Sequence, residues 1–246
     1  MSAPYAAIAK LYDRRNVVND YVRWAEFIMR RLPDPAERAV RVLDLCCGTG
    51  TIAGLLSKHG YAVTGIDQSA EMLAIARAAV PSATFVCAAL PECRLGERGE
   101  FDAAVCTFDS VNYLVTDDAV RKVLTQLAVV MRPGGAFIFD VNTRHKLEQV
   151  GNSHYGDDLG DYAYVWRNRL DNAAHRIEFL ITLFSERGGV FLRETEHHVQ
   201  RWFERPELEA DAAAAGFVVE AVTDDYTDSP ATGQTRRETW VLRRAG

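Results

Sequence analysis

Hydrophobic and polar positions follow two different periodic patterns along this chain. From about residue 40 to residue 143, short apolar segments rich in β-branched residues alternate with segments in which apolar residues recur every three or four positions. This alternation is typical of βαβ units, whose strands pair in parallel and are covered by helices. It predicts five strands, over residues 40–46, 61–67, 84–88, 101–107 and 136–141.

The connecting helices are predicted from helical spacing and from residues that begin or end helices. One helix is expected over 70–79, because Ser69 has the residue type and place of an N-cap and Pro81 follows its end. Another carries apolar residues at helical spacing from 120 to 131 and is expected to end at the Arg-Pro-Gly-Gly turn over 132–135.

After residue 143 the pattern changes, and apolar and polar residues alternate with a period of two. Segments 162–169, 176–185 and 191–202 predict partly charged strands joined by turns, which form an antiparallel insert after the fifth strand. A helix over 206–215 and strands over 217–222 and 238–242 follow. The predicted divisions are an N-terminal helical lid (1–38), an α/β core (39–143), the insert (144–204) and a segment that completes the core sheet (205–246).

Composition narrows the class of protein. With 246 residues, 48% of them hydrophobic, the chain suits one large globular domain or a core with an appended piece. It has no apolar run near the ~18 residues of a membrane span and no signal-peptide pattern at its start. We therefore expect a cytoplasmic protein with no membrane partner.

Charge and cysteine content exclude further classes. The net charge is −6 and no basic stripe is present, which disfavours a nucleic-acid partner. Five cysteines without a CxxC pair predict neither a disulfide framework nor a structural zinc site. No metal is expected.

The most informative stretch is 42–50, a strand that leads into a glycine-rich turn and then a helix. Glycines allow a ligand to approach the backbone, and the helix start offers unpaired N–H groups. Asp67 ends the second strand, where a carboxylate can accept both hydroxyls of a ribose. Asp44 lies four residues before Gly48 and would repel the pyrophosphate of a dinucleotide, whereas it suits a cofactor with a cationic amino-acid end. A nicotinamide cofactor is the disfavoured alternative.

At these residues the chain resembles the class I S-adenosylmethionine-dependent methyltransferases, whose first motif is acid-x-Gly-x-Gly-x-Gly. Cys46 stands at the first glycine of that motif. Residues 65–76, 101–114 and 127–140 resemble the later motifs of the superfamily in the same order. The chain departs from the superfamily at 88–90, Ala-Ala-Leu, where an acid often receives the adenine amino group. Among these enzymes it is most similar to amino-sugar N,N-dimethyltransferases, glycine N-methyltransferase and peptide α-amino methyltransferases.

The resemblance implies a Rossmann-like, mostly parallel sheet of seven strands flanked by helices, with S-adenosyl-L-methionine as cofactor and S-adenosyl-L-homocysteine as product. It places Asp67 on the ribose, Gly48 and Gly50 near the methionine part and Met72 on the adenine. The residues that it implies in cofactor binding are Tyr12, Tyr21, Trp24, Asp44, Cys46, Gly48, Thr49, Gly50, Asp67, Gln68, Met72, Ala89, Leu90, Thr107 and Phe108.

Three residues are candidates for catalysis. Tyr113 follows the fourth strand, and we expect its hydroxyl to orient the acceptor, with proton removal left to water, Asp109 or His198. The expected reaction is methyl transfer to a small molecule or short peptide, at an amine. O-methylation of a small metabolite and a catalytically inactive, cofactor-binding regulatory protein are the alternatives. A homodimer is also left open.

Overall fold

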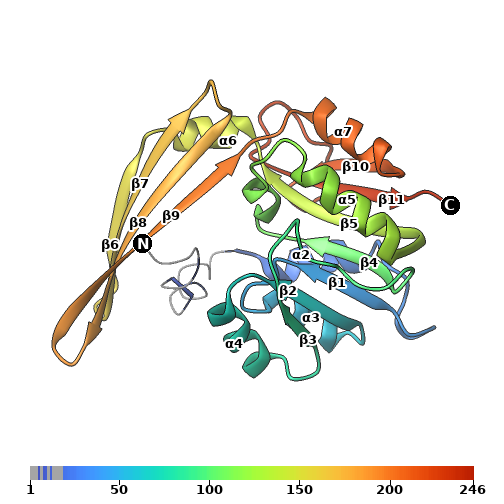
Figure 1. Ribbon diagram of the computed structural model, residues 1–246, viewed down its shortest axis with the longest axis horizontal. Helices are drawn as coiled ribbons and strands as arrows, with labels where there is room; N and C mark the ends of the chain where they lie inside the picture. The colour runs from blue at the N-terminus through green and yellow to red at the C-terminus, as the bar shows by residue number, and fades with distance from the viewer. Residues whose placement is uncertain (1–4, 6–7, 10–11, 13–18) are drawn as a thin grey trace.

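The computed structural model describes residues 5, 8, 9, 12 and 19–246. Two separate sheets form the fold (Figure 1). The larger one has the order β10-β11-β5-β4-β1-β2-β3 and the smaller one the order β6-β7-β8-β9. The strands are β1 (Arg41–Leu45), β2 (Ala62–Asp67), β3 (Thr84–Cys87), β4 (Phe101–Cys106), β5 (Met131–Asn142), β6 (His154–Asp158), β7 (Tyr162–Asp171), β8 (Arg176–Arg187), β9 (Val190–Arg201), β10 (Phe217–Asp224) and β11 (Arg237–Arg244).

Helices cover both faces of the seven-stranded sheet. On one face pack α2 (Tyr21–Met29), α3 (Thr51–Lys58) and α4 (Ala70–Ala79), and on the other α5 (Ala119–Val130) and α7 (Arg205–Ala214). The side chains of successive residues of β1 point to opposite faces of the sheet. Leu43 packs on the face covered by α5, and Val42 packs on the face covered by α3. Because side chains alternate along a strand, an uninterrupted apolar strand is what a sheet covered on both faces requires.

The order of the parallel strands reverses beside β1. This strand pairs in parallel with β2 on one side and with β4 on the other, while the chain continues from β2 to β3 and from β4 to β5. Ligands of open α/β sheets bind at such a reversal, beyond the carboxyl ends of the strands. Only β11 runs antiparallel to its neighbours β5 and β10 within this sheet.

The predicted fold class is confirmed, including the antiparallel sheet inserted between β5 and α7. The prediction that residues 132–135 form a turn before the fifth strand is wrong, because β5 already begins at Met131. Met131 pairs with Phe101 and Ala136 with Ala103, so the Arg-Pro-Gly-Gly residues bulge out of a continuous strand. The pattern also missed β6, because all of its side chains are exposed and show no alternation.

The segment expected to form an N-terminal lid is described only in part. Helix α2 begins after Asp20, whose side chain accepts a hydrogen bond from the Arg23 N–H, and it packs on α3. The helices expected before it fall largely on residues 1–4, 6–7, 10–11 and 13–18, which lie outside the described residues. Among the helices that are described, none has the length and apolar character needed to cross a membrane.

Candidate active site

The turn after β1 is built from residues with left-handed backbone angles. Cys46, Gly48 and Gly50 have φ values of 55°, 55° and 80°. A side chain at Gly50 would lie 3.1 Å from the Ala76 Cβ atom, so this glycine is needed for packing against α4. At Gly48 an added Cβ atom would meet nothing within 4 Å, which leaves the backbone open to a ligand.

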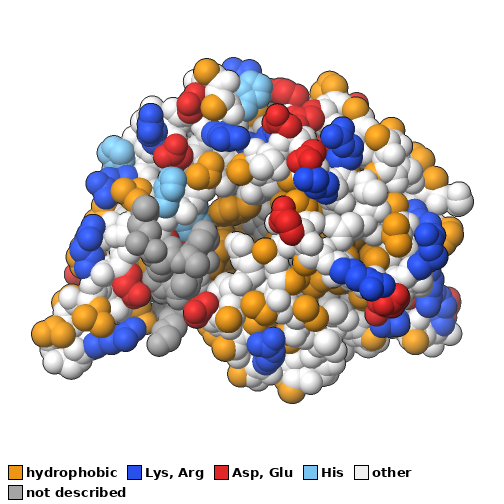
Figure 2. Space-filling model, in the orientation of Figure 1, with side chains coloured by type: hydrophobic (Ala, Val, Ile, Leu, Met, Phe, Trp, Pro, Cys, Tyr) orange, Lys and Arg blue, Asp and Glu red, His pale blue; other side chains and the backbone are white. Residues whose placement is uncertain are grey.

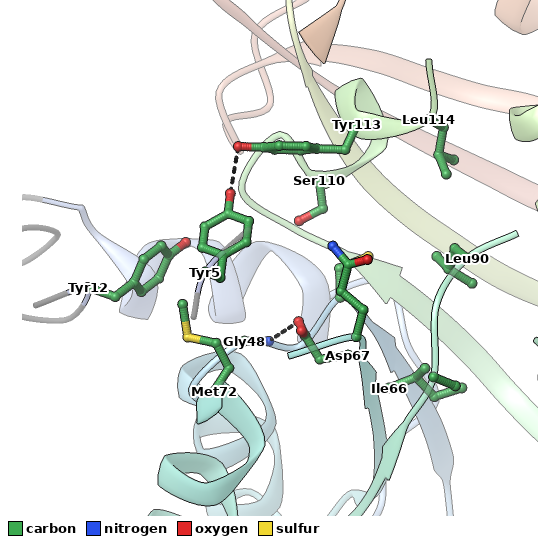
Figure 3. A pocket seen from close by; sticks show the side chains of 13 residues that line it. Tyr5, Tyr12, Gly48, Ile66, Asp67, Met72, Leu90, Ser110, Tyr113 and Leu114 are labelled. Carbon is green, nitrogen blue, oxygen red and sulfur yellow. Dashed lines mark hydrogen bonds between the residues drawn. The ribbon is translucent and has the colours of Figure 1, made fainter. Parts of the chain in front are cut away.

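Asp67, at the end of β2, is fixed against this turn. Its Oδ2 atom accepts the Gly48 N–H at 2.9 Å (Figure 3), and its Oδ1 atom accepts the Ser69 N–H at 2.8 Å. Burial raises the pKa of this carboxyl, and the two N–H groups oppose that shift. The hydrogen bonds therefore hold the carboxylate in place at the carboxyl edge of the sheet.

Asp44 is a buried carboxyl beneath the same turn. It is 1% exposed, and no described residue forms a hydrogen bond of normal geometry with either carboxylate oxygen. Burial, helped by the charge of Asp67, raises its pKa to about 8, while the nearby N–H of Ala53 opposes the shift. An unpartnered acid in such a place favours a ligand that brings a cationic group to it.

A cavity opens over the turn, between β2 and the segment after β4 (Figure 3). It contains about 730 Å³ of empty space, part of which is open to solvent. Eight of the residues expected to bind the cofactor or the acceptor line it: Tyr12, Cys46, Gly48, Asp67, Gln68, Met72, Leu90 and Tyr113. A small adjoining cavity is lined by four more, Tyr21, Thr49, Thr107 and Phe108.

The remaining four candidates for cofactor binding line neither cavity. Asp44 lies beneath the turn, Gly50 is the turn residue that packs against α4, and Ala89 is next to the lining residue Leu90. Trp24 is 2% exposed and stacks on Tyr226, with ring centroids 4.9 Å apart. Trp24 therefore lies on the buried face of α2 and is part of the hydrophobic core.

A second cavity lies between the smaller sheet and the larger one, with about 1240 Å³ of empty space that includes some open solvent. It is bounded by η1, a 3₁₀ helix over Ser110–Tyr113, by the smaller sheet and by α6 (Arg144–Val150). Tyr5, Tyr12 and Tyr113 line both this cavity and the one over the turn. The smaller sheet contributes an apolar and aromatic wall of Tyr155, Tyr164, Trp166, Phe179 and Ile181. The three tyrosines therefore stand at the boundary between two adjoining chambers.

A buried charge network holds Asp109 at the edge of the second cavity. Its Oδ1 atom accepts the Arg237 Nη2–H at 3.0 Å and its Oδ2 atom accepts the Gln200 Nε2–H at 2.7 Å. Arg237 also pairs with Asp140, whose pKa is raised by burial against the opposing charge of that guanidinium. Phe108 and Asp109 have φ values of 61° and 52°. The network thus stabilises a turn in the sparsely populated left-handed region.

The three candidate catalytic residues meet at the second cavity, which Asp109, Tyr113 and His198 all line. The Tyr5 hydroxyl donates to the Tyr113 oxygen at 2.7 Å (Figure 3), and the Tyr113 hydroxyl lies 3.1 Å from His198 Nδ1. Burial raises the pKa of Tyr113, although its hydrogen bond with Tyr5 opposes the shift. Tyr113 is therefore a neutral hydroxyl at neutral pH.

The sequence analysis missed several polar residues of this region: Tyr5, Lys146, Glu196 and Arg237. Glu196 shares a face of β9 with His198 because it lies two positions away, and both side chains are buried. His197, between them, is exposed, as expected for neighbours on a strand. That alternation was the available signal for Glu196. Within the described part of the chain, no cluster of three His, Cys, Asp or Glu residues suits a metal ion.

Comparison with known proteins identifies the family. A sequence profile for the "Methyltransferase domain" matches residues 42–135. The Bacillus subtilis (strain 168) protein YqeM, whose name assigns it to the methyltransferases, is 33% identical over 236 residues, covering 95% of this chain and 94% of YqeM. The crystal structure of a S-adenosylmethionine-dependent methyltransferase from Clostridium acetobutylicum ATCC 824 superposes with a TM-score of 0.85 at 26% identity, covering 98% of both chains. The chain belongs to the class I S-adenosylmethionine-dependent methyltransferases.

A third relative of this methyltransferase has a named substrate. It is the Streptomyces fradiae dTDP-3-amino-3,6-dideoxy-alpha-D-glucopyranose N,N-dimethyltransferase, 28% identical over 220 residues, which cover 87% of this chain and 84% of that enzyme. The predicted family, enzyme class and cofactor are confirmed, and the nicotinamide alternative is set aside by the family assignment.

The residues present fit S-adenosylmethionine. Asp44 offers a buried carboxylate that lacks a hydrogen-bond donor among the described residues, Gly48 leaves an open backbone, and Asp67 presents acceptor oxygens at the end of β2. Asp44 and the open backbone at Gly48 would hold the amino-acid end of the cofactor, and Asp67 would hold its ribose. The cofactor, when bound, supplies the methyl group that the methyltransferase transfers.

Proposed function

We propose that this methyltransferase transfers the methyl group to an amine nitrogen of a small molecule or short peptide. The observation that carries the proposal is the pair of adjoining cavities that share Tyr5, Tyr12 and Tyr113. One cavity lies over the cofactor turn, and the other has about 1240 Å³ of empty space, part of it open to solvent, which is room enough for a compact acceptor. The amino-sugar N,N-dimethyltransferase relative supports nitrogen as the methyl acceptor.

The hydrogen-bonding groups around the second cavity suit an amine. Asp109 and the Tyr113 oxygen are acceptors, which an N–H donor can reach from within the cavity. The chain's task is to align the acceptor nitrogen and exclude water, and alignment of this kind contributes ~7–11 kcal/mol in favourable cases. A dedicated nucleophile is not required.

One observation favours a second candidate, O-methylation of a carboxylate. Lys146 lines the same cavity and donates from Nζ to the Asn142 Oδ1 atom at 2.5 Å. Burial lowers its pKa, and the charge of Asp109 opposes that shift. A cationic side chain so placed could bind an anionic acceptor. The two candidates differ in the atom that receives the methyl group.

The test is incubation with labelled S-adenosylmethionine and a panel of amino sugars, amines, short peptides, carboxylates and phenols, followed by mass spectrometry. N-methylated product supports the proposal, and methyl esters or ethers alone support the second candidate. A protein that binds S-adenosylhomocysteine but yields no product with any acceptor would be the inactive regulatory alternative.

Tyr113→Phe tests the assigned position of the acceptor. If the Tyr113 hydroxyl forms a hydrogen bond that is stronger in the transition state, its loss would raise the activation free energy of turnover by ~0.5–3 kcal/mol and leave cofactor affinity unchanged. Tyr226→Phe is the matched control, because the buried Tyr226 hydroxyl has no partner among the described residues and lies outside both cavities. Wild-type kcat and KM in Tyr113→Phe would reduce Tyr113 to a packing role.

We also propose that the protein forms a homodimer. On the face seen in Figure 2, basic and acidic side chains are interspersed. Three consecutive apolar residues, Val190, Phe191 and Leu192, are exposed at the start of β9, with Val190 and Leu192 on one face of the strand and Phe191 on the other. Exposed apolar side chains that gather on a surface often mark protein contacts. Sedimentation of the wild-type protein and of Phe191→Ser tests this, and a wild-type monomer at all concentrations contradicts it.

A further inference from the structure

Three nitrogen atoms lie within hydrogen-bond distance of a single buried carboxylate, Glu196. Its Oε2 atom accepts the backbone N–H of Tyr5 at 3.0 Å and lies 2.8 Å from His198 Nε2. Its Oε1 atom accepts the backbone N–H of Ile8 at 3.0 Å. Glu196 is 0% exposed and His198 2% exposed. A carboxylate suits this place because, when ionised, it accepts hydrogen bonds and donates none.

These contacts fix the direction of a longer chain of hydrogen bonds. An ionised Glu196 only accepts hydrogen bonds, which assigns the His198 proton to Nε2 and leaves Nδ1 as an acceptor. Nδ1 then accepts a hydrogen bond from the Tyr113 hydroxyl, and the Tyr113 oxygen in turn accepts a hydrogen bond from the Tyr5 hydroxyl. The Tyr113 oxygen lines both cavities, and an amine held beside it would replace the Gln200 side chain as the second hydrogen-bond donor to this oxygen. An amine held there could donate to it.

We propose that Glu196 is the positioning residue of a proton acceptor, His198, which takes the acceptor amine's proton through the Tyr113 hydroxyl. This inference rests on the proposed N-methylation. Glu196 fixes the reactive tautomer of His198, and the same carboxylate ties Tyr5 to the Tyr113 hydroxyl. One buried side chain therefore orders both ends of the hydrogen-bonded chain.

The proton balance is complete within these residues. The ammonium of the acceptor passes one proton to the Tyr113 oxygen, while the hydroxyl proton of Tyr113 moves to His198 Nδ1. The amine becomes neutral, Tyr113 remains a hydroxyl, and the imidazole becomes an imidazolium whose charge Glu196 compensates. The freed lone pair of the nitrogen then accepts the methyl group. Tyr113 relays the proton and holds no charge before or after the step.

The charged and titratable groups around His198 come from each element that packs near it. Glu196 lies on its own strand, the Tyr5 ring packs edge-on at 4.9 Å, and Tyr113 approaches from η1. Across the cavity are Asp109, Arg237 and Lys146. Asp109 and Arg237 are paired with each other. Of these groups, only Glu196 contacts the Nε2 atom of His198 in the described structure.

The experiment compares Glu196→Gln with the wild-type chain. A glutamine amide cannot accept all three N–H groups, because its NH₂ end would face a donor. We expect kcat with an amine acceptor to fall by about tenfold to a hundredfold, which is less than the ~10²–10⁴-fold contribution of a general base because the variant keeps His198 itself. We also expect the acidic limb of the kcat–pH profile to move to lower pH, because the imidazolium loses its compensating carboxylate.

Two measurements do not depend on turnover. Nitrogen NMR should show the His198 proton on Nε2 in the wild-type protein, and amide exchange at Tyr5 and Ile8 should be faster in Glu196→Gln. The matched control is Glu178→Gln, which removes an exposed Glu–His contact, 3.2 Å from His197, on the opposite face of the same strands. This control should leave the profile and the exchange rates unchanged.

Several results would overturn the inference. One is an active Glu196→Gln enzyme with the wild-type pH profile, and another is a loss of kcat that is equal at every pH, as a merely structural role would give. A His198 proton on Nδ1 would also contradict it. Failure of the proposed function looks different: the wild-type protein then methylates no amine at any pH, and the proton step is overturned with it.

Discussion

Asp44→Asn should make the stability of the unliganded protein less dependent on pH. The carboxyl of Asp44 is buried, and its pKa rises from 3.8 to about 8, chiefly through burial. Between these values the unfolded chain releases a proton that the folded protein retains. Rising pH therefore favours the unfolded state, and stability falls as the pH passes from about 4 to about 8. Asparagine has nearly the same shape and carries no charge.

The size of the effect follows from the shift in pKa. One pKa unit corresponds to ~1.4 kcal/mol. From about pH 5 to about pH 8, ionisation of Asp44 should lower the wild-type free energy of unfolding by about 3 to 4 kcal/mol. Asp44→Asn should lack this loss. A bound ligand with a cationic group would relieve the buried charge, so S-adenosylhomocysteine should stabilise the wild type more than the variant at the higher pH.

The assay is urea unfolding of both proteins at the two pH values. Asp102→Asn is the control. Burial would raise the pKa of Asp102, but the N–H of Arg41 and the side chains of Arg38 and Arg132 outweigh it and lower the pKa. That variant should lose a similar stability at both pH values, since Asp102 is ionised throughout this range. An Asp44→Asn protein with the same pH dependence as the wild type would refute the reasoning.

Two further outcomes follow from the contacts of single residues. Asp67→Ala removes the acceptor at the end of β2 and should weaken S-adenosylhomocysteine binding by ~1–3 kcal/mol in calorimetric titration; unchanged affinity would argue against a ribose contact. Arg237→Leu leaves the buried carboxylate of Asp140 and the half-buried carboxylate of Asp109 without their cation, so unfolding by denaturant should show a loss of ~3–5 kcal/mol. A loss below about 1 kcal/mol would mean that the network contributes little net stability.

The sequence alone determined the α/β core and the cofactor turn, because both depend on short stretches of chain. The apolar strand ending at Leu45, the glycines at 48 and 50 and the acid at 67 lie within one βαβ unit, where spacing fixes position. The same holds for helix α4, whose N-cap Ser69 accepts the Met72 N–H as predicted. Period-two alternation likewise located three of the four strands of the smaller sheet, and missed the fourth because it is exposed on both faces.

Only the tertiary structure decided which distant side chains meet. Tyr5 and Glu196 are 191 positions apart, and Tyr113 and His198 are 85 positions apart, so no local pattern relates them. Trp24 could belong to a lid or to the core on its spacing alone, and its stacking on Tyr226 placed it in the core. The physical reason is that local periodicity reports which face of an element is buried. The partner on the other side is chosen by how the elements pack, and here that packing set three N–H donors around Glu196.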